Sequence, residues 1–89
     1  MFRLWGKIIK RNNIIADKVF ELNEPGLSLE EKVDKAMEDL CYHFDIQQPL
    51  WIMDNQSDFS MMGKTRFSEG HFMEPIRFDF FEIEVIEDK

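Results

Sequence analysis

The stretch Phe2–Leu22, FRLWGKIIKRNNIIADKVFEL, decides the fold. Apolar and polar residues alternate on both sides of Arg11-Asn12-Asn13, as they do in two strands joined by a tight turn. A slip of one residue between paired strands would move every side chain to the other face, so the turn length sets which residues lie opposite one another. The stretch therefore predicts an N-terminal β-hairpin.

Two loop lengths give different cross-strand pairs. A two-residue turn sets Lys7 against Lys18 and Leu4 against Glu21, and both pairings are unfavourable. A three-residue loop avoids them and requires a left-handed backbone at Asn13, which asparagine tolerates. We therefore predict the pairs Phe2 with Leu22, Arg3 with Glu21, Leu4 with Phe20, Trp5 with Val19, Lys7 with Asp17 and Ile9 with Ile15.

The most regular pattern follows after residue 28. Ser28 and Glu31 fit a capping box, in which the serine hydroxyl and the glutamate carboxylate each accept a hydrogen bond from a free backbone N–H at the start of a helix. Apolar residues then recur at helical spacing as far as Phe44, with charged residues on the other side. We expect an amphipathic helix that ends near Asp45.

Shorter elements are expected beyond the helix. Leu50–Met53 has no polar alternation and predicts a short strand buried on both faces. Asp58–Met62 fits one helical turn that Gly63 stops, and Lys64–Phe67 fits a short extended piece. The segment 54–75 is otherwise without a clear period.

The last strand is expected over Ile76–Ile86. A bulge near Phe80 and Phe81 would return its apolar residues to one face. The elements together predict one α+β domain over residues 1–89, with an N-terminal β-hairpin, one amphipathic helix packed on a small, mainly antiparallel sheet, and a bulged C-terminal strand.

Length and composition exclude several protein classes. With 89 residues, 44% of them hydrophobic, the chain suffices for one domain with a core. Its longest apolar runs, such as Leu50–Met53, are far shorter than the roughly 20 residues that cross a bilayer, so no membrane segment is expected. The N-terminus lacks a secretory-signal pattern, and the single cysteine, Cys41, cannot form an internal disulfide, so we expect a cytoplasmic protein.

Charge is unevenly distributed along the chain. The net charge is −7, but residues 1–18 hold five bases and one acid, a net charge of +4, whereas residues 19–89 hold six bases and seventeen acids, a net charge of −11. Such asymmetry is compatible with an acidic partner or with a basic strand that lies beside an acidic one. A nucleic-acid partner is not expected, because the protein as a whole is anionic.

No motif identifies a catalytic or metal site. Gly63-Lys64-Thr65 resembles the end of a phosphate-binding loop, but Asp58 stands where that loop needs a glycine. Cys41 falls within the apolar stripe of the helix, where a thiol is expected to be core. A metal site needs three or four converging ligands, and only scattered candidates are present. We therefore predict no catalytic residue, no metal ion and no cofactor.

Aromatic residues and methionines are concentrated in the second half of the chain. They make up eleven of the thirty-one residues from Trp51 to Phe81. One interpretation is that these residues fill the only core of a short chain. The other is that, together with the mixed face of the hairpin, they exceed what one helix and four strands can cover, which favours a non-enzymatic interaction module that forms a homodimer or binds a protein partner. The interface residues predicted on this basis are Trp5, Ile9, Ile15, Val19, Phe59, Met61 and Met62.

The alternative is a binding site for a small molecule or anion, with or without enzymatic activity, in the segment 54–75. Structureless segments of this length in small domains are often functional. The candidate ligand-binding residues are Lys64, Arg66 and His71, of which the first two form an isolated basic pair in an acidic region.

The opening Phe2–Ile9 and the closing blocks Gly63–Phe67, His71–Ile76 and Phe81–Glu84 resemble a group of short uncharacterised proteins from clostridial-type bacteria. The resemblance extends over most of the chain. It implies a small bacterial protein and assigns no functional residue.

Overall fold

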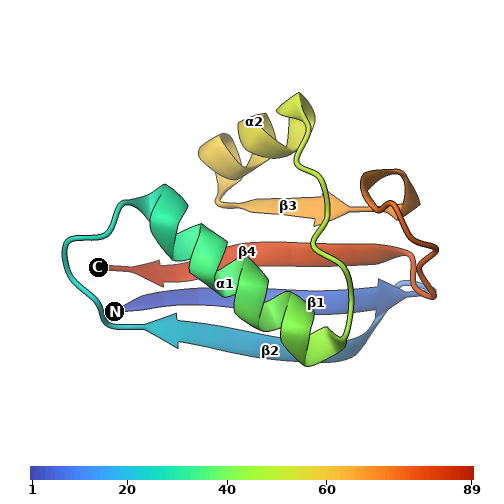
Figure 1. Ribbon diagram of the computed structural model, residues 1–89, viewed down its shortest axis with the longest axis horizontal. Helices are drawn as coiled ribbons and strands as arrows, with labels where there is room; N and C mark the ends of the chain where they lie inside the picture. The colour runs from blue at the N-terminus through green and yellow to red at the C-terminus, as the bar shows by residue number, and fades with distance from the viewer.

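The centre of the sheet is formed by the two ends of the chain. A computed structural model describes residues 1–89 (Figure 1). Its four strands are all antiparallel to their neighbours and lie in the order β2-β1-β4-β3. They span β1 (Phe2–Lys10), β2 (Asn13–Leu22), β3 (Lys64–Phe67) and β4 (Phe80–Asp88). The predicted α+β fold with an N-terminal hairpin is therefore confirmed.

The predicted hairpin register is confirmed over most of its length. It holds from Phe2 opposite Leu22 to Lys7 opposite Asp17. β1 lies between β2 and β4, and all of its side chains except those of Arg3 and Lys10 are buried or half-buried. Gly6 lies under the helix that covers this face, since a Cβ at that position would come within 2.9 Å of the Leu40 side chain.

The prediction for the turn was wrong. Ile9 lies opposite Ile14 and not Ile15, because the register shifts between Ile8 and Ile9. The left-handed residues are Arg11 and Asn12, with φ of 52° and 66°, and Asn13 already belongs to β2. A two-residue turn of this kind matches the twist of paired strands, and a bulge then inserts one residue that restores the favourable pairs farther along.

The predicted helix is α1 (Leu29–Phe44), and both of its ends are confirmed. The Ser28 hydroxyl accepts a hydrogen bond from the backbone N–H of Glu31, and the Glu31 carboxylate accepts one from the N–H of Ser28. Asp45 ends the helix in a left-handed conformation. In Figure 1, α1 crosses one face of the sheet.

A second helix, α2 (Met53–Met62), replaces the predicted strand Leu50–Met53. Leu50, Ile52 and Met53 are exposed, and only Trp51 of this apolar run packs against the core. The predicted helical turn before Gly63 is the second half of α2, and Gly63 ends the helix with a φ of 69°. The extended piece at residues 64–67 is confirmed as β3.

Asn55 explains why α2 lies where it does. It is a buried side chain whose amide nitrogen donates hydrogen bonds to Thr65 Oγ1 and to the carbonyl of Arg66, each at 2.9 Å. Its oxygen accepts a hydrogen bond from the N–H of Ile52 at the start of the helix. These contacts attach α2 to β3 on the same face of the sheet that α1 covers.

The last strand starts later than predicted. β4 begins at Phe80, whereas Ile76 and Phe78 lie in the preceding loop and pack against the core from there. No register shift occurs near Phe80 and Phe81, where a bulge was predicted. The shift lies opposite Arg3 and Leu4, at the other end of β4. A short 3-10 helix, η1 (Glu69–His71), lies between β3 and this loop.

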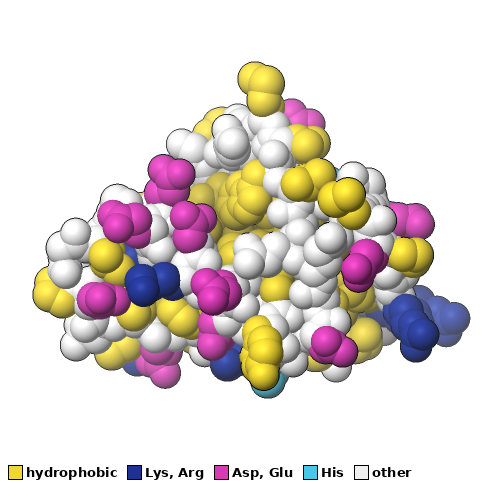
Figure 2. Space-filling model, in the orientation of Figure 1, with side chains coloured by type: hydrophobic (Ala, Val, Ile, Leu, Met, Phe, Trp, Pro, Cys, Tyr) yellow, Lys and Arg dark blue, Asp and Glu magenta, His cyan; other side chains and the backbone are white.

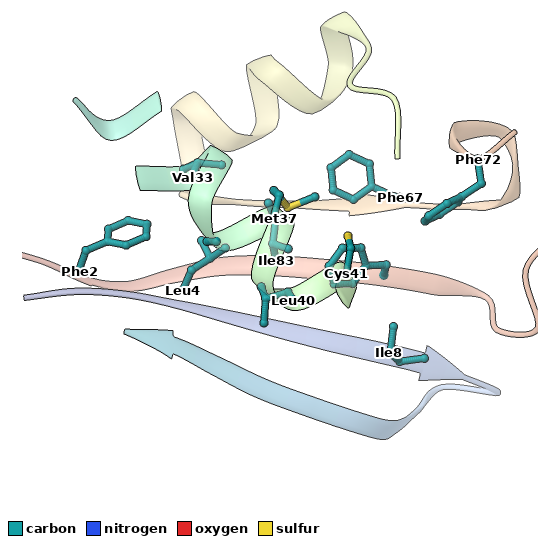
Figure 3. Close-up of a cluster of buried hydrophobic side chains, with 12 residues drawn as sticks. Phe2, Leu4, Ile8, Val33, Met37, Leu40, Cys41, Phe67, Phe72 and Ile83 are labelled. Carbon is teal, nitrogen blue, oxygen red and sulfur yellow. The ribbon is translucent and has the colours of Figure 1, made fainter. Parts of the chain in front are cut away.

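One core fills the space between the sheet and the helices (Figure 3). α1 contributes five buried residues, and the strands contribute the aromatic and aliphatic side chains that face them. Leu40 is fully buried and lies against Gly6. The twelve residues are Phe2, Leu4, Ile8, Val33, Ala36, Met37, Leu40, Cys41, Phe67, Phe72, Phe81 and Ile83.

The contact between α1 and the sheet can be tested at Leu40, which is fully buried. We expect Leu40→Ala to lower the free energy of unfolding by about 2–5 kcal/mol, because it removes buried methyl groups and leaves a cavity above Gly6. Urea denaturation measures the change. Tyr42→Ala is the matched control, because Tyr42 is 89% exposed on the same helix, and its effect is expected to stay within about 0.5 kcal/mol. Equal losses for the two variants would contradict this packing.

Candidate functional site

Two surfaces of the molecule have the composition of binding sites. One is the face of the sheet that carries no helix, called here the open face. The other is the groove between α1 and α2. The open face is described first, because most of the residues singled out by sequence lie on it.

The centre of the open face is a network of charged side chains. Lys7 Nζ donates hydrogen bonds to Glu82 Oε2 at 2.7 Å and to Glu84 Oε1 at 3.0 Å. Arg66 Nε donates to the other oxygen of Glu82 at 2.6 Å. The strand register produces this network directly, because Lys7 and Arg66 lie opposite Glu82 on its two neighbouring strands.

Aromatic rings shield the network from solvent. Lys7 Nζ lies 3.9 Å from the centroid of the Trp5 ring, and the guanidinium carbon of Arg66 lies 4.9 Å from that of Phe80. The side chains of Lys7 and Glu82 are consequently only 7% and 9% exposed, although no helix covers them. A third contact fixes Trp5, whose Nε1 donates a hydrogen bond to Asp17 Oδ2 at 2.8 Å.

The network holds both of its buried groups in the charged state. Burial acts to lower the pKa of Lys7, but the hydrogen bonds and charges of Glu82 and Glu84 outweigh it and raise this pKa above its ordinary value. Burial acts to raise the pKa of Glu82, but Lys7 and Arg66 outweigh it and lower that pKa. Both shifts move away from neutrality, so neither group is suited to exchange protons near pH 7.

The sequence candidates Lys64, Arg66 and His71 do not converge. Lys64 and Arg66 share the open face of β3, where Glu84 and Glu82 lie opposite them. His71 packs its ring on Phe67, which points into the core on the other side of the strand, with ring centroids 5.6 Å apart. Its Nδ1 accepts a hydrogen bond from the N–H of Ser68. Closeness in sequence suggested one site, but His71 follows β3 in the 3-10 helix Glu69–His71 and packs on the opposite side of the strand from Lys64 and Arg66.

The hairpin candidates lie together, with different exposures. Trp5 is half-buried and Ile9 is buried. Ile15 and Val19 are 57% and 39% exposed on β2, an edge strand that pairs only with β1. Ile14, which sequence reasoning did not select, is 51% exposed and lies opposite Ile9 because of the bulge. We call Trp5, Ile9, Ile14, Ile15 and Val19 the hairpin patch.

The α2 candidates face in different directions. Phe59 is half-buried, and its ring meets Trp51 edge-on, with centroids 5.6 Å apart. Met61 and Met62 are exposed at the end of the helix. Only Phe59 lines the groove between the two helices.

This groove has a volume of about 650 Å³. Figure 2 shows it as a hollow with a hydrophobic floor, flanked by acidic side chains on the side of α1. Glu30 and Asp34 are one helical turn apart on that wall. The lining residues are Leu29, Glu30, Val33, Asp34, Trp51, Gln56, Phe59 and Ser60, among which there is no lysine or arginine.

The remaining chemistry-bearing residues do not form a site. Cys41 is a buried free thiol, and burial raises its pKa to about 12. No three His, Cys, Asp or Glu side chains are grouped so that they could hold a metal ion. None of the helices has the length and apolar character needed to cross a membrane.

Comparison with protein-family models, with curated proteins and with solved structures gave no significant match. The resemblance to short clostridial-type proteins therefore stays a prediction. The functional argument that follows is based on the geometry of this chain alone.

The buried network predicts a pH-dependent contribution to stability. Glu82→Gln should lower the free energy of unfolding by about 2–3 kcal/mol at pH 7, because Lys7 and Arg66 lose a buried charged partner. The pKa of Glu82 is lowered in the fold, so its contribution is present above its unfolded pKa of about 4.3 and is lost as the pH falls through the folded value. Urea titrations of both proteins from pH 7 to pH 2 should therefore converge at the acid end.

Glu21→Gln serves as the control for this prediction. Glu21 forms an ion pair with Arg3 at 3.0 Å, but both side chains are about half exposed. The expected loss is below about 1 kcal/mol. A loss for Glu82→Gln no larger than that of the control would refute a structural role for the network.

Proposed function

We propose that this protein is a small, non-enzymatic interaction module that self-associates through the hairpin patch. The observation that carries the proposal is the exposure of Ile14, Ile15 and Val19 on β2, an edge strand of the sheet. Burying one such side chain contributes about 1.5–3 kcal/mol, and contiguous exposed apolar side chains often mark protein contact surfaces. The patch includes Trp5, a residue type enriched at interfaces.

The charges of β2 favour packing of side chains over addition of a strand at the free edge. A twofold pairing of two β2 strands centred on Asp17 or on Lys18 would place identical charges opposite each other. A pairing centred on Val19 would place Asp17 opposite Glu21. Like charges at directly opposed positions are destabilising, and charged residues commonly protect edge strands in this way.

The open-face network supports a non-enzymatic protein. Its pKa shifts keep Lys7 and Glu82 charged, and the hydrogen bonds of Glu82 are all made to neighbouring strands. The alternative of an anion site at Lys64, Arg66 and His71 has less support, because the guanidinium of Arg66 is held by Glu82 and His71 lies on the other side of β3. We also propose a cytoplasmic bacterial protein, since its one cysteine is a buried thiol.

Sedimentation velocity at high micromolar concentration tests the proposal. The natural chain is expected to sediment as a dimer or larger species, whereas Ile15→Glu and Val19→Glu should each shift it toward the monomer, because a charge replaces an apolar contact. Tyr42→Glu is the matched control, with the same substituted residue and greater exposure on α1. Its sedimentation should equal that of the natural chain.

A monomeric natural chain at these concentrations would overturn the proposal. It would also be overturned if Ile15→Glu and Val19→Glu sedimented as the control does. Circular dichroism of each variant, expected to match the natural chain, verifies that the fold is retained.

A further inference from the structure

The groove between α1 and α2 matches another part of the same molecule. Its floor is apolar, with Val33, Trp51 and Phe59, and its α1 wall carries Glu30 and Asp34. A volume of about 650 Å³ lies within the roughly 300–1,000 Å³ typical of concave binding sites. A fitting occupant therefore presents apolar side chains next to positive charge.

The end of the hairpin has that composition. Lys10 and Arg11 are exposed, and neither side chain forms an ion pair within the molecule. Ile14 and Ile15 follow directly on the other strand, because Lys10 lies opposite Asn13. We call Lys10, Arg11, Ile14 and Ile15 the hairpin tip. Figure 2 shows basic side chains at the end of the molecule where Figure 1 places the β1–β2 turn.

We infer that the hairpin tip of one copy docks in the α1–α2 groove of another copy. This inference rests on the proposed function, namely that the chain self-associates through its hairpin, and it names the surface that the hairpin meets. Ile14 and Ile15 pack on Trp51 and Phe59, while the two basic residues of the tip lie against the acidic wall of the groove.

The distribution of charge favours docking of the tip in the groove over contact between two hairpin tips. In a twofold contact centred on the hairpin tip, the tip meets its own copy, so Lys10 and Arg11 would approach the same two charges of the partner. Two copies with a net charge of −7 also repel each other unless oppositely charged surfaces meet. The hairpin tip and the groove have opposite charges, and each presents apolar side chains that the other can cover.

A positively charged occupant would reduce the electrostatic repulsion within the groove wall. Glu30 and Asp34 are four residues apart on α1, the spacing at which two like charges destabilise a helix. The closest bases along α1 do not line the groove, and Lys32 is engaged with Asp88. A lysine or arginine from a second copy would offset this repulsion. Association should therefore weaken as salt screens the charges.

A charge-swap experiment tests the inference. The groove variant combines Glu30→Lys with Asp34→Lys, and the tip variant combines Lys10→Glu with Arg11→Glu. Each variant alone is expected to self-associate about tenfold or more weakly than the natural chain in sedimentation velocity. An equimolar mixture should recover association, because both of its possible contacts then join opposite charges.

The control changes net charge by the same amount as the groove variant, at sites outside both surfaces. Glu24→Lys combined with Glu38→Lys alters two exposed acids and should associate as the natural chain does. Circular dichroism verifies that each double variant is folded. A second groove variant, Asp34→Asn alone, removes charge without reversal and should give a smaller loss of the same kind.

The outcomes separate this inference from the proposed function. If Ile15→Glu dissociates the assembly while the groove variant behaves as the control, the hairpin patch meets some other surface, and the inference is overturned but the proposed function is not. If both swap variants dissociate and their mixture does not recover, charge complementarity is absent and the inference again fails. If the natural chain is monomeric, both proposals fail.

Discussion

β1 is hydrogen-bonded along both of its edges, to β2 on one side and to β4 on the other, and the rest of the structure depends on this double pairing. The hairpin alone would be a two-stranded ribbon, which has marginal stability in water. Pairing with β4 adds a third strand and brings Phe81 and Ile83 beside Leu4 and Ile8. α1 then has a broad apolar surface on which to bury its stripe.

The same pairing produces the character of the two sheet faces. On one face the register gathers apolar side chains beneath α1, and on the other it sets Lys7 between Glu82 and Glu84. Burying charges without helical cover is costly unless they are fully paired. The Trp5 ring shields Lys7 from solvent, and Arg66 donates a hydrogen bond to Glu82. The open face thus has paired charges at its centre and exposed apolar side chains at its hairpin end.

Local patterns predicted the elements whose determinants lie within one stretch of chain. The capping residues Ser28 and Glu31 and the helical spacing up to Phe44 sufficed for α1, and the charge pairs sufficed for most of the hairpin register. Elements whose determinants are distant were missed. The start of α2 depends on the hydrogen bonds of Asn55 to β3, and an apolar run such as Leu50–Met53 carries no sign of them.

The residues of the candidate surfaces also differ in whether a local sequence pattern could indicate them. The exposed positions Ile15 and Val19 were accessible from strand alternation, whereas Ile14 required knowledge of a bulge that only the two-residue turn imposes. Arg66 and His71 were grouped by sequence distance, although the chain leaves β3 after Phe67 and the 3-10 helix places His71 on the other side of the strand. The groove joins residues near 30 with residues near 60, so no local pattern could have indicated it.

The central position of β1 also shapes how the chain folds during synthesis. β1 precedes its second partner, β4, by most of the domain, so one edge of the hairpin stays unpaired until residues 80–88 have been synthesised. Contacts between segments so far apart in sequence slow folding, and a strand edge left free in the meantime is exposed to wrong partners. Charged side chains on an unpaired strand disfavour pairing with a wrong partner, and Arg3, Lys7 and Lys10 are spaced along β1.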